Sequence, residues 1–302
     1  MNKNVMGHLT AIITIVIWGV TFICTKLLLE HLNPFSIMFY RFLLAYIILL
    51  VAYPKRQKTF VLKEELKFLL AGFSGVTLYL LLENTAISFS TASNVGLIVS
   101  SGPMFTAVAF SLFYKAEKIG KPFFIGFVIA FAGIFLVMFS GQGNVSFNPI
   151  GDILALLAAM SWGAYSLFYR KAADFNTDII LITRKTFFYG LLTMLPLTPF
   201  FDLSADFSVF TDASVLFNFF FLGALASSMC YVSWSYACNV LGSVKTSAYI
   251  YLIPFISLLA SAIVLGEKIT FIKLAGCVLI LAGVYISSTK KQAQNKTTIE
   301  TA

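Results

Sequence analysis

Apolar residues run along this chain in long blocks separated by short polar segments. Ten blocks come close to the roughly 20 residues that a helix needs to cross about 30 Å of hydrocarbon. They are residues 9–29, 34–53, 68–87, 92–114, 123–139, 150–169, 179–201, 215–237, 244–265 and 271–287. Most are apolar on every side, which favours helices that span a membrane over helices that lie on its surface. The pattern therefore predicts an all-α polytopic membrane protein with ten transmembrane helices.

The composition agrees with a membrane protein, because 59% of the residues are hydrophobic, only 11% are charged and the mean hydropathy is +0.89. The first block is longer than the apolar part of a secretory signal and a second block follows at once, so we expect it to be retained. The four cysteines lack the paired spacing of a disulfide framework or a zinc site. We therefore expect no metal and no cofactor.

The basic residues indicate an orientation. With a cytoplasmic amino terminus, the even-numbered loops and both tails hold most of the loop lysines and arginines, including Lys63 and Arg170, whereas the opposite loops hold only Lys268 and Lys273. By the positive-inside rule both termini face the cytoplasm, and we expect a prokaryotic cytoplasmic membrane. This distribution explains the net charge of +8 without a nucleic-acid partner.

The chain also contains an internal repeat with an offset of about 150 residues. The matching pairs are Trp18-Gly19 with Trp162-Gly163, Pro103 with Pro254, and Ala116-Glu117-Lys118-Ile119 with Gly266-Glu267-Lys268-Ile269. Residues 1–145 and 146–289 are thus predicted to be two five-helix units, and residues 290–302 a cytoplasmic tail. Because five is odd, the second unit enters the membrane with the opposite polarity. Two inverted repeats suit a transporter that works by alternating access.

Several motifs look like the EamA branch of the drug/metabolite transporter superfamily. They are Trp-Gly in the first helix of each repeat, Tyr40-Arg41-Phe42, Glu83-Asn84-Thr85-Ala86, Thr91-Ala92-Ser93-Asn94, and Glu-Lys-Ile before the last helix of each repeat. The resemblance covers about residues 7–288. It implies a ten-helix permease with a central cavity lined by the first four helices of each repeat. Many bacterial members are exporters, and the family's substrates include amino acids, sugars, nucleotides, choline and drugs.

Aromatic residues near the middle of the spans are candidates for substrate binding. Trp18 and Trp162 lie about halfway along their spans, away from the membrane interfaces that tryptophan usually prefers. Trp234, Tyr79 and Tyr231 add further rings, and such a set favours an organic cation or a planar ring. The alternative interpretation is that the tryptophans face lipid or pack against neighbouring helices.

Glu83 is the sharpest single candidate, because an ionisable side chain inside a span costs about 3 kcal/mol on insertion scales and should face the bundle interior. Three roles are open: a counter-charge for an amine, a proton carrier, or a structural partner. Arg41 lies at a similar depth, and an Arg41–Glu83 pair is the structural alternative. Arg184 is a second buried arginine, which either reaches the cytoplasmic surface or binds an anionic group.

Three further positions complete the candidates. Asn94 either orients a ligand or ties helices together. Pro103 and Pro254 fall inside the fourth and ninth spans, where proline removes a helical hydrogen bond, so they serve gating or a fixed kink. Glycines at 126, 133, 276 and 283 indicate close helix contact, within the chain or in a homodimer.

Together these patterns predict a secondary transporter that moves a small organic metabolite or drug outward. Its substrate is an amine or quaternary cation, or an amino acid. The chain has no ATP-binding motif, so the driving force is a gradient of the solute, of protons or of another ion. Uptake by the same fold is the first alternative. An intramembrane enzyme needs paired catalytic groups that the sequence does not offer, and a membrane scaffold would give the inverted repeat no mechanical purpose.

Overall fold

The computed structural model describes residues 3–55, 61–113, 120–138, 149–172, 178–203, 206–241, 246 and 248–300. For residues 138, 248 and 287–300 it describes the backbone alone. The first Glu-Lys-Ile motif, at 116–119, and the predicted boundary between the repeats at 145 lie outside these residues. Below, the first half means the described residues up to 138, and the second half those from 149 onward.

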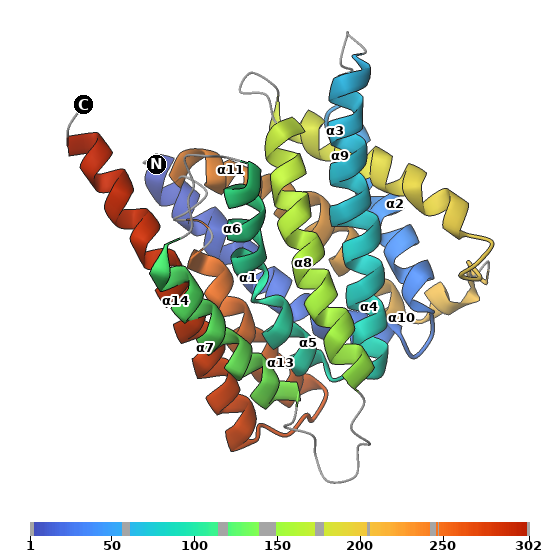
Figure 1. Cartoon of the computed structure of the whole chain (residues 1–302). Coiled ribbons are helices and arrows are strands. Elements are labelled where there is room, and N and C mark those ends of the chain that lie inside the picture. The colour runs from blue at the N-terminus through green and yellow to red at the C-terminus, as the bar shows by residue number, and fades with distance from the viewer. Residues whose placement is uncertain are drawn as a thin grey trace.

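The described residues form helices and contain no strand (Figure 1). The first half contains α1 (Lys3–Leu28), α2 (Pro34–Ala52), α3 (Leu62–Gly72), η1 (Phe73–Leu78), α4 (Tyr79–Phe89), α5 (Ala92–Val99), α6 (Gly102–Phe113) and α7 (Lys121–Met138). The second half contains α8 (Pro149–Ala172), α9 (Ile179–Met194), η2 (Leu195–Leu197), η3 (Ser208–Thr211), α10 (Ala213–Phe220), η4 (Phe221–Met229), α11 (Cys230–Leu241), η5 (Ala248–Leu252), α13 (Ile253–Val264) and α14 (Phe271–Glu300).

Seven helical stretches are long and apolar enough to cross a membrane: Lys3–Leu28, Pro34–Ala52, Leu62–Phe89, Ala92–Phe113, Pro149–Ala172, Ile179–Leu197 and Ala213–Leu241. Three shorter apolar helices are Lys121–Val137, Tyr249–Val264 and Phe271–Ile286. Each of the ten apolar blocks therefore falls on a helix, and the all-α polytopic fold is confirmed. That all ten cross the bilayer as inverted repeats stays a prediction.

The same kinds of interruption occur in both halves. The π-helical segment η1 joins α3 to α4, and the π-helical segment η4 joins α10 to α11. The fourth span is split into α5 and α6, and the ninth into the short 3₁₀ helix η5 and α13. Pro103 and Pro254 are each the second residue of the later helix, where a missing N–H costs no hydrogen bond. Both prolines thus begin a helix rather than kink a continuous one.

The last helices of the two halves, α7 and α14, pack side by side at one edge of the bundle (Figure 1). A methyl group on Gly133 would lie 2.7 Å from the carbonyl oxygen of Gly276, so only glycine allows this approach. The outer faces of the pair carry apolar side chains such as Phe124 and Phe271, which are 61% and 84% exposed. The glycines thus serve a contact within the chain, while the exposed rings suit lipid.

A buried ion pair joins α3 to α9. Glu65 accepts hydrogen bonds from Lys185 Nζ at 2.5 Å and from the Tyr189 hydroxyl at 2.6 Å. The two helices approach closely nearby, because a side chain on Gly72 would meet the backbone nitrogen of Gly190 at 2.5 Å. This pair lies away from the centre of the bundle and is fully satisfied by protein groups.

The first helix passes between the two largest apolar cores. One core contains Phe22, Ile98 and Val284, and the other contains Phe42 and Phe187. The Trp18 side chain packs against both cores. The middle of α1 therefore lies where these two cores, each built from both halves, come together.

Candidate functional site

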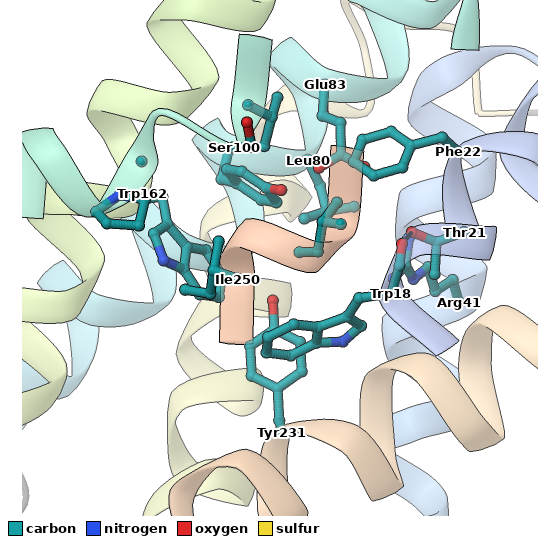
Figure 2. Close-up of a pocket in the computed structure, with 15 residues that line it drawn as sticks. Trp18, Thr21, Phe22, Arg41, Leu80, Glu83, Ser100, Trp162, Tyr231 and Ile250 are labelled. Carbon is teal, nitrogen blue, oxygen red and sulfur yellow. Dashed lines mark hydrogen bonds between the residues drawn. The ribbon is translucent and has the colours of Figure 1, made fainter. Parts of the chain in front are cut away.

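A cavity lies at this meeting place, and Figure 2 shows the side chains turned toward it. Its lining consists of Trp18, Thr21, Phe22, Arg41, Tyr79, Leu80, Glu83, Val99, Ser100, Gly102, Pro103, Trp162, Tyr231, Ile250 and Ile253. The cavity and its opening enclose about 600 Å³. These residues come from α1, α2, α4 and the α5–α6 junction of the first half, and from α8, α11, η5 and α13 of the second.

The expected wall from the first four helices of each repeat is thus found with one exception. Within the described chain, α9 contributes no side chain to this lining. Its ring Phe187 packs behind Tyr231, at 5.2 Å between ring centroids, so Tyr231 separates α9 from the cavity.

Four aromatic rings form the floor and walls of the cavity. Trp18 and Trp162, one from each half, meet edge to face with centroids 5.8 Å apart and planes at 83°. Tyr231 lies 5.6 Å from Trp18 and 6.2 Å from Trp162, and Tyr79 lies 5.2 Å from Trp162. Edge-to-face pairs of this kind are each worth about 0.5–1.5 kcal/mol. The matched tryptophans therefore face each other inside the bundle and not the lipid.

Two of the predicted binding residues lie outside the lining. Trp234 packs behind Trp18, with ring centroids 5.3 Å apart, and so supports the wall without forming it. Asn94 lies at the start of α5, where its side chain hydrogen-bonds Asp152 and its backbone N–H donates to Thr91 Oγ1 at 3.2 Å. The structure therefore brings together Trp18, Tyr79, Glu83, Trp162 and Tyr231 and leaves these two residues aside.

Glu83 reaches the cavity from α4 and is 3% exposed. Its hydrogen-bond partner is the Tyr79 side chain, one helical turn earlier. The ion pairs formed within the described ranges, Lys67–Glu64, Lys185–Glu65 and Lys273–Glu267, do not include the Arg41–Glu83 pair. Glu83 is thus a buried carboxylate that feels the charge of Arg41 across the cavity without touching it.

Arg41 reaches the cavity from α2 and is 4% exposed. Its Nε–H donates to Ser227 Oγ in η4 at 2.7 Å, and its guanidinium carbon lies 5.6 Å from the Phe42 ring centre. Its Nη1 atom is buried and has no hydrogen-bond partner among the described residues. In Figure 2 Arg41 and Thr21 lie on one side of the cavity and Trp162 on the other.

Arg184 lies outside the cavity lining, and backbone carbonyls accept hydrogen bonds from its guanidinium. Its two terminal nitrogens donate to the carbonyl oxygens of Tyr53 and Lys55, just past the last residue of α2. A cation at this position hydrogen-bonds free carbonyls and complements the negative end of the helix dipole. The contact explains why the residue is only 7% exposed. Of the two predicted arginines, only Arg41 faces the cavity.

The two prolines also differ in whether they line the cavity. Pro103 lines the cavity beside Gly102, at the break between α5 and α6, whereas Pro254 is buried but does not line it. At the break, Ser101 N–H donates to Ile98 O and Met104 N–H to Ser101 O. The α5–α6 junction therefore presents irregular backbone to the cavity, which a membrane tolerates where protein or a cavity surrounds it.

A group of polar residues joins the start of α5 to the second half, and we call it the α5 cap cluster: Thr91, Ser93, Glu267 and Lys273. Glu267 accepts hydrogen bonds from the Ala92 and Ser93 N–H groups at 2.9 and 3.3 Å, and from the Ser93 hydroxyl. Lys273 Nζ donates to Ser93 Oγ at 2.8 Å and lies 3.9 Å from Glu267. A carboxylate from the second half thus caps a helix of the first.

A second polar link lies at the same end. Lys26 Nζ, near the end of α1, donates to the carbonyls of Ile87 and Ser90 at 2.6 and 3.0 Å. The Ser90 hydroxyl donates to Asp152 Oδ1, at the start of α8, at 2.7 Å. The two halves are therefore held together at this end by hydrogen bonds as well as by packing.

The sequence interpretation did not single out these contacts. Glu267 was noted only as part of a repeated motif, and Lys273 was assigned to a loop, although it is 2% exposed. Ser227 was not named at all. Their common signal is a polar residue beside an apolar block, which becomes informative only when a specific partner in the other half is known.

A family model described as the EamA-like transporter family matches residues 5–139 and 149–289. An uncharacterized transporter of Archaeoglobus fulgidus is 29% identical over 95% of this chain and 99% of its own. Proteins named probable amino-acid metabolite efflux pump, from Salmonella typhimurium and Escherichia coli, are each 24% identical over 92% of this chain and 93% of theirs.

A solved structure described as "Crystal structure of protein" shares the fold, with a TM-score of 0.64 at 15% identity over 95% of this chain and 98% of that one. The family match covers nearly the whole chain and coincides with the helices that enclose the cavity. This chain therefore belongs to the EamA-like transporter family and is a multi-pass membrane protein.

Proposed function

We propose that this protein is a secondary transporter of the cytoplasmic membrane, and that it exports a small organic solute carrying a protonated amine by alternating access. The observation that carries the proposal is the central cavity, where matched tryptophans of the two halves and the buried Glu83 face one space. Export is supported by the names of the Salmonella and Escherichia coli relatives.

The chemistry of the cavity favours an amine. Aromatic faces attract an organic cation, and a carboxylate without a basic contact supplies its counter-charge. Because a lone ionised carboxylate is costly in a bilayer, a protein keeps one there for function. In the proposed cycle Glu83 binds either the amine or a proton, so that a proton moves inward as the amine moves outward.

Alternating access is supported by the repetition of the helix breaks. A π-helical segment and a split span occur in each half, around the cavity. Segments of this kind are frequent at functional sites. In an inverted-repeat transporter, exchange of the conformations of the two halves moves the opening from one membrane face to the other. We propose that both termini are cytoplasmic, so the α5 cap cluster lies at the outer face.

The proposal is tested with purified protein in proteoliposomes. Phenethylamine, tetraethylammonium, L-phenylalanine and a sugar are offered with and without an imposed pH gradient. We expect flux of the amine to depend on the gradient in the native protein. Glu83→Gln should lower this flux by at least about tenfold and abolish its response to the gradient, because the amide carries no charge and does not titrate near neutral pH.

The matched control is Glu30→Gln, because Glu30 is an exposed carboxylate outside the cavity. It should leave flux and pH response unchanged. If Glu83→Gln behaves like Glu30→Gln, the amine and proton roles of Glu83 both fall. If no amine or amino acid crosses with the native protein, the transport proposal itself is wrong.

A further inference from the structure

Arg41 has unused hydrogen-bonding capacity inside the cavity. A guanidinium has five N–H donors, yet the protein hydrogen bond of Arg41 is the one from Nε–H to Ser227 Oγ. Its Nη1 atom is buried and has no hydrogen-bond partner among the described residues, and the residue as a whole is only 4% exposed. Leaving a buried charged donor unpaired costs more than an ordinary missing hydrogen bond. The Arg41 guanidinium therefore has donor capacity that an anionic oxygen of a bound solute would satisfy.

No carboxylate of the described chain fills this position. Glu83 hydrogen-bonds Tyr79 instead, and the other groups that interact electrostatically with Arg41 are Cys24, Tyr79, Cys230 and Tyr231. By contrast, the buried Arg184 donates to two backbone carbonyls. The protein therefore satisfies a buried arginine where its role is structural and leaves one incompletely paired in the cavity wall.

The position of Ser227 adds a second observation. Ser227 is fully buried in η4, the π-helical segment of the second half, while Arg41 belongs to α2 of the first. Its hydroxyl holds the Nε–H of the guanidinium, while Nη1 stays without a hydrogen-bond partner among the described residues and Arg41 lines the cavity. A fork of parallel N–H groups matches the two oxygens of a carboxylate.

We propose that Arg41, held by Ser227, is the binding site for the carboxylate of a zwitterionic solute. The ammonium group of that solute lies toward Glu83, and its apolar part lies against Trp18, Trp162 and Tyr231. A solute with both charges neutralises Arg41 and Glu83 together, which removes the cost of two unpaired buried charges. This inference rests on the proposed function and narrows its substrate class to amino acids with apolar or aromatic side chains.

The test compares three solutes of nearly equal size in proteoliposomes: L-phenylalanine, phenethylamine, which lacks the carboxylate, and 3-phenylpropionate, which lacks the amine. We expect the native protein to prefer L-phenylalanine over each of the others by about tenfold or more, since each lacks one charge-assisted pair. Arg41→Gln should remove the preference for L-phenylalanine over phenethylamine while phenethylamine flux persists.

Ser227→Ala keeps the arginine and loses its hydrogen bond, so it serves if Arg41→Gln fails to fold. It should raise the half-saturating concentration of L-phenylalanine several-fold and leave that of phenethylamine unchanged. Arg170→Gln, at an exposed arginine outside the cavity, is the matched control.

Each remaining outcome is decisive. The inference is wrong if Arg41→Gln and Ser227→Ala reduce both solutes equally, because the residues then serve structure alone. It is also wrong if the native protein carries phenethylamine but not L-phenylalanine, a result that leaves the proposed function standing. If it carries none of the three, the proposed function fails with it.

Discussion

At the scale of single residues, the buried charges of this protein divide by whether the protein itself satisfies them. Glu65 is paired with Lys185, and Arg184 donates to backbone carbonyls. Glu83 and Arg41 face the cavity without pairing with each other. Buried depth alone therefore does not separate the two groups, whereas an ion-pair partner or a pair of backbone acceptors within the protein does.

Arg184 provides a test of this distinction. Arg184→Met removes two charge-assisted hydrogen bonds, each worth about 1.5–3 kcal/mol, and leaves the carbonyls of Tyr53 and Lys55 without their donor. We expect the thermal unfolding temperature of the detergent-solubilised protein to fall by several degrees. The half-saturating solute concentration of the folded fraction should stay within about twofold of the native value.

Lys63→Met, at an exposed position of α3 outside the cavity, is the comparison and should change neither quantity. An unchanged unfolding temperature together with a raised half-saturating concentration would show that Arg184 reaches the solute.

The sequence identified these residues but could not assign their partners. Glu83, Arg41, Trp18 and Trp162 were recognised because their chemistry or their repetition is unusual within an apolar block. The predicted alternative of an Arg41–Glu83 pair fits their similar depth, but depth does not specify which way a side chain points around a helix. Here Tyr79, one turn before Glu83 on the same helix, takes the position of partner.

At the scale of elements, α5 depends on a residue that is distant in the sequence. The Thr91 hydroxyl accepts from the Asn94 N–H. The Glu267 carboxylate of the second half accepts from the two preceding N–H groups of the same helix, those of Ala92 and Ser93. A capping contact of this kind contributes about 1 kcal/mol. It therefore favours the arrangement of the two halves seen here, in which Glu267 holds the start of α5.

Glu267→Gln tests that bias. We expect it to weaken the α5 cap cluster and to open this end more often, by about fivefold for a loss of about 1 kcal/mol. The measurement is the reaction rate of Thr21→Cys, at the cavity wall, in a chain without its four native cysteines. A membrane-impermeant thiol reagent is added from the side of the cluster.

Glu30→Gln removes an exposed carboxylate just after α1 and should leave the rate unchanged. A rate that also stays unchanged with Glu267→Gln would mean that the cap does not hold this end shut.

Element boundaries were the part of the fold that the sequence predicted least well. Pro103 and Pro254 were expected inside continuous spans, yet each begins a new helix. The π-helical segments η1 and η4 were not anticipated, because an extra residue in a helical turn leaves the hydrophobic pattern nearly unchanged. Apolar content is visible in a sequence, whereas the hydrogen-bond pattern that subdivides it depends on the neighbouring helices.

At the scale of the whole molecule, the orientation of the chain in the membrane is a prediction that can be checked directly. The exposed residues Arg170, in the last turn of α8, and Lys268, after α13, are placed by the charge pattern at opposite faces of the membrane. In the cysteine-free chain, we expect Lys268→Cys to react with an impermeant maleimide in intact cells. Arg170→Cys should react only after the cells are broken. The reverse labelling would place both termini outside.

The overall architecture followed from the sequence more readily than the site did. In a bilayer, a long apolar block must satisfy its backbone hydrogen bonds within itself, and a helix does so. The all-α fold could therefore be predicted from the length and composition of the blocks. The cavity required seven of the ten apolar blocks to lie side by side, an arrangement that no single block encodes.

The edge-to-face contact of Trp18 and Trp162 has a further consequence for the cell. A bacterial membrane sustains a voltage, and a continuous thread of water through a resting carrier would discharge it by letting ions leak. Because two indoles meet at the centre and an apolar core packs against them, little room remains for such a thread. The rings that we propose to bind the solute would thus also hinder the leakage of ions through the idle protein.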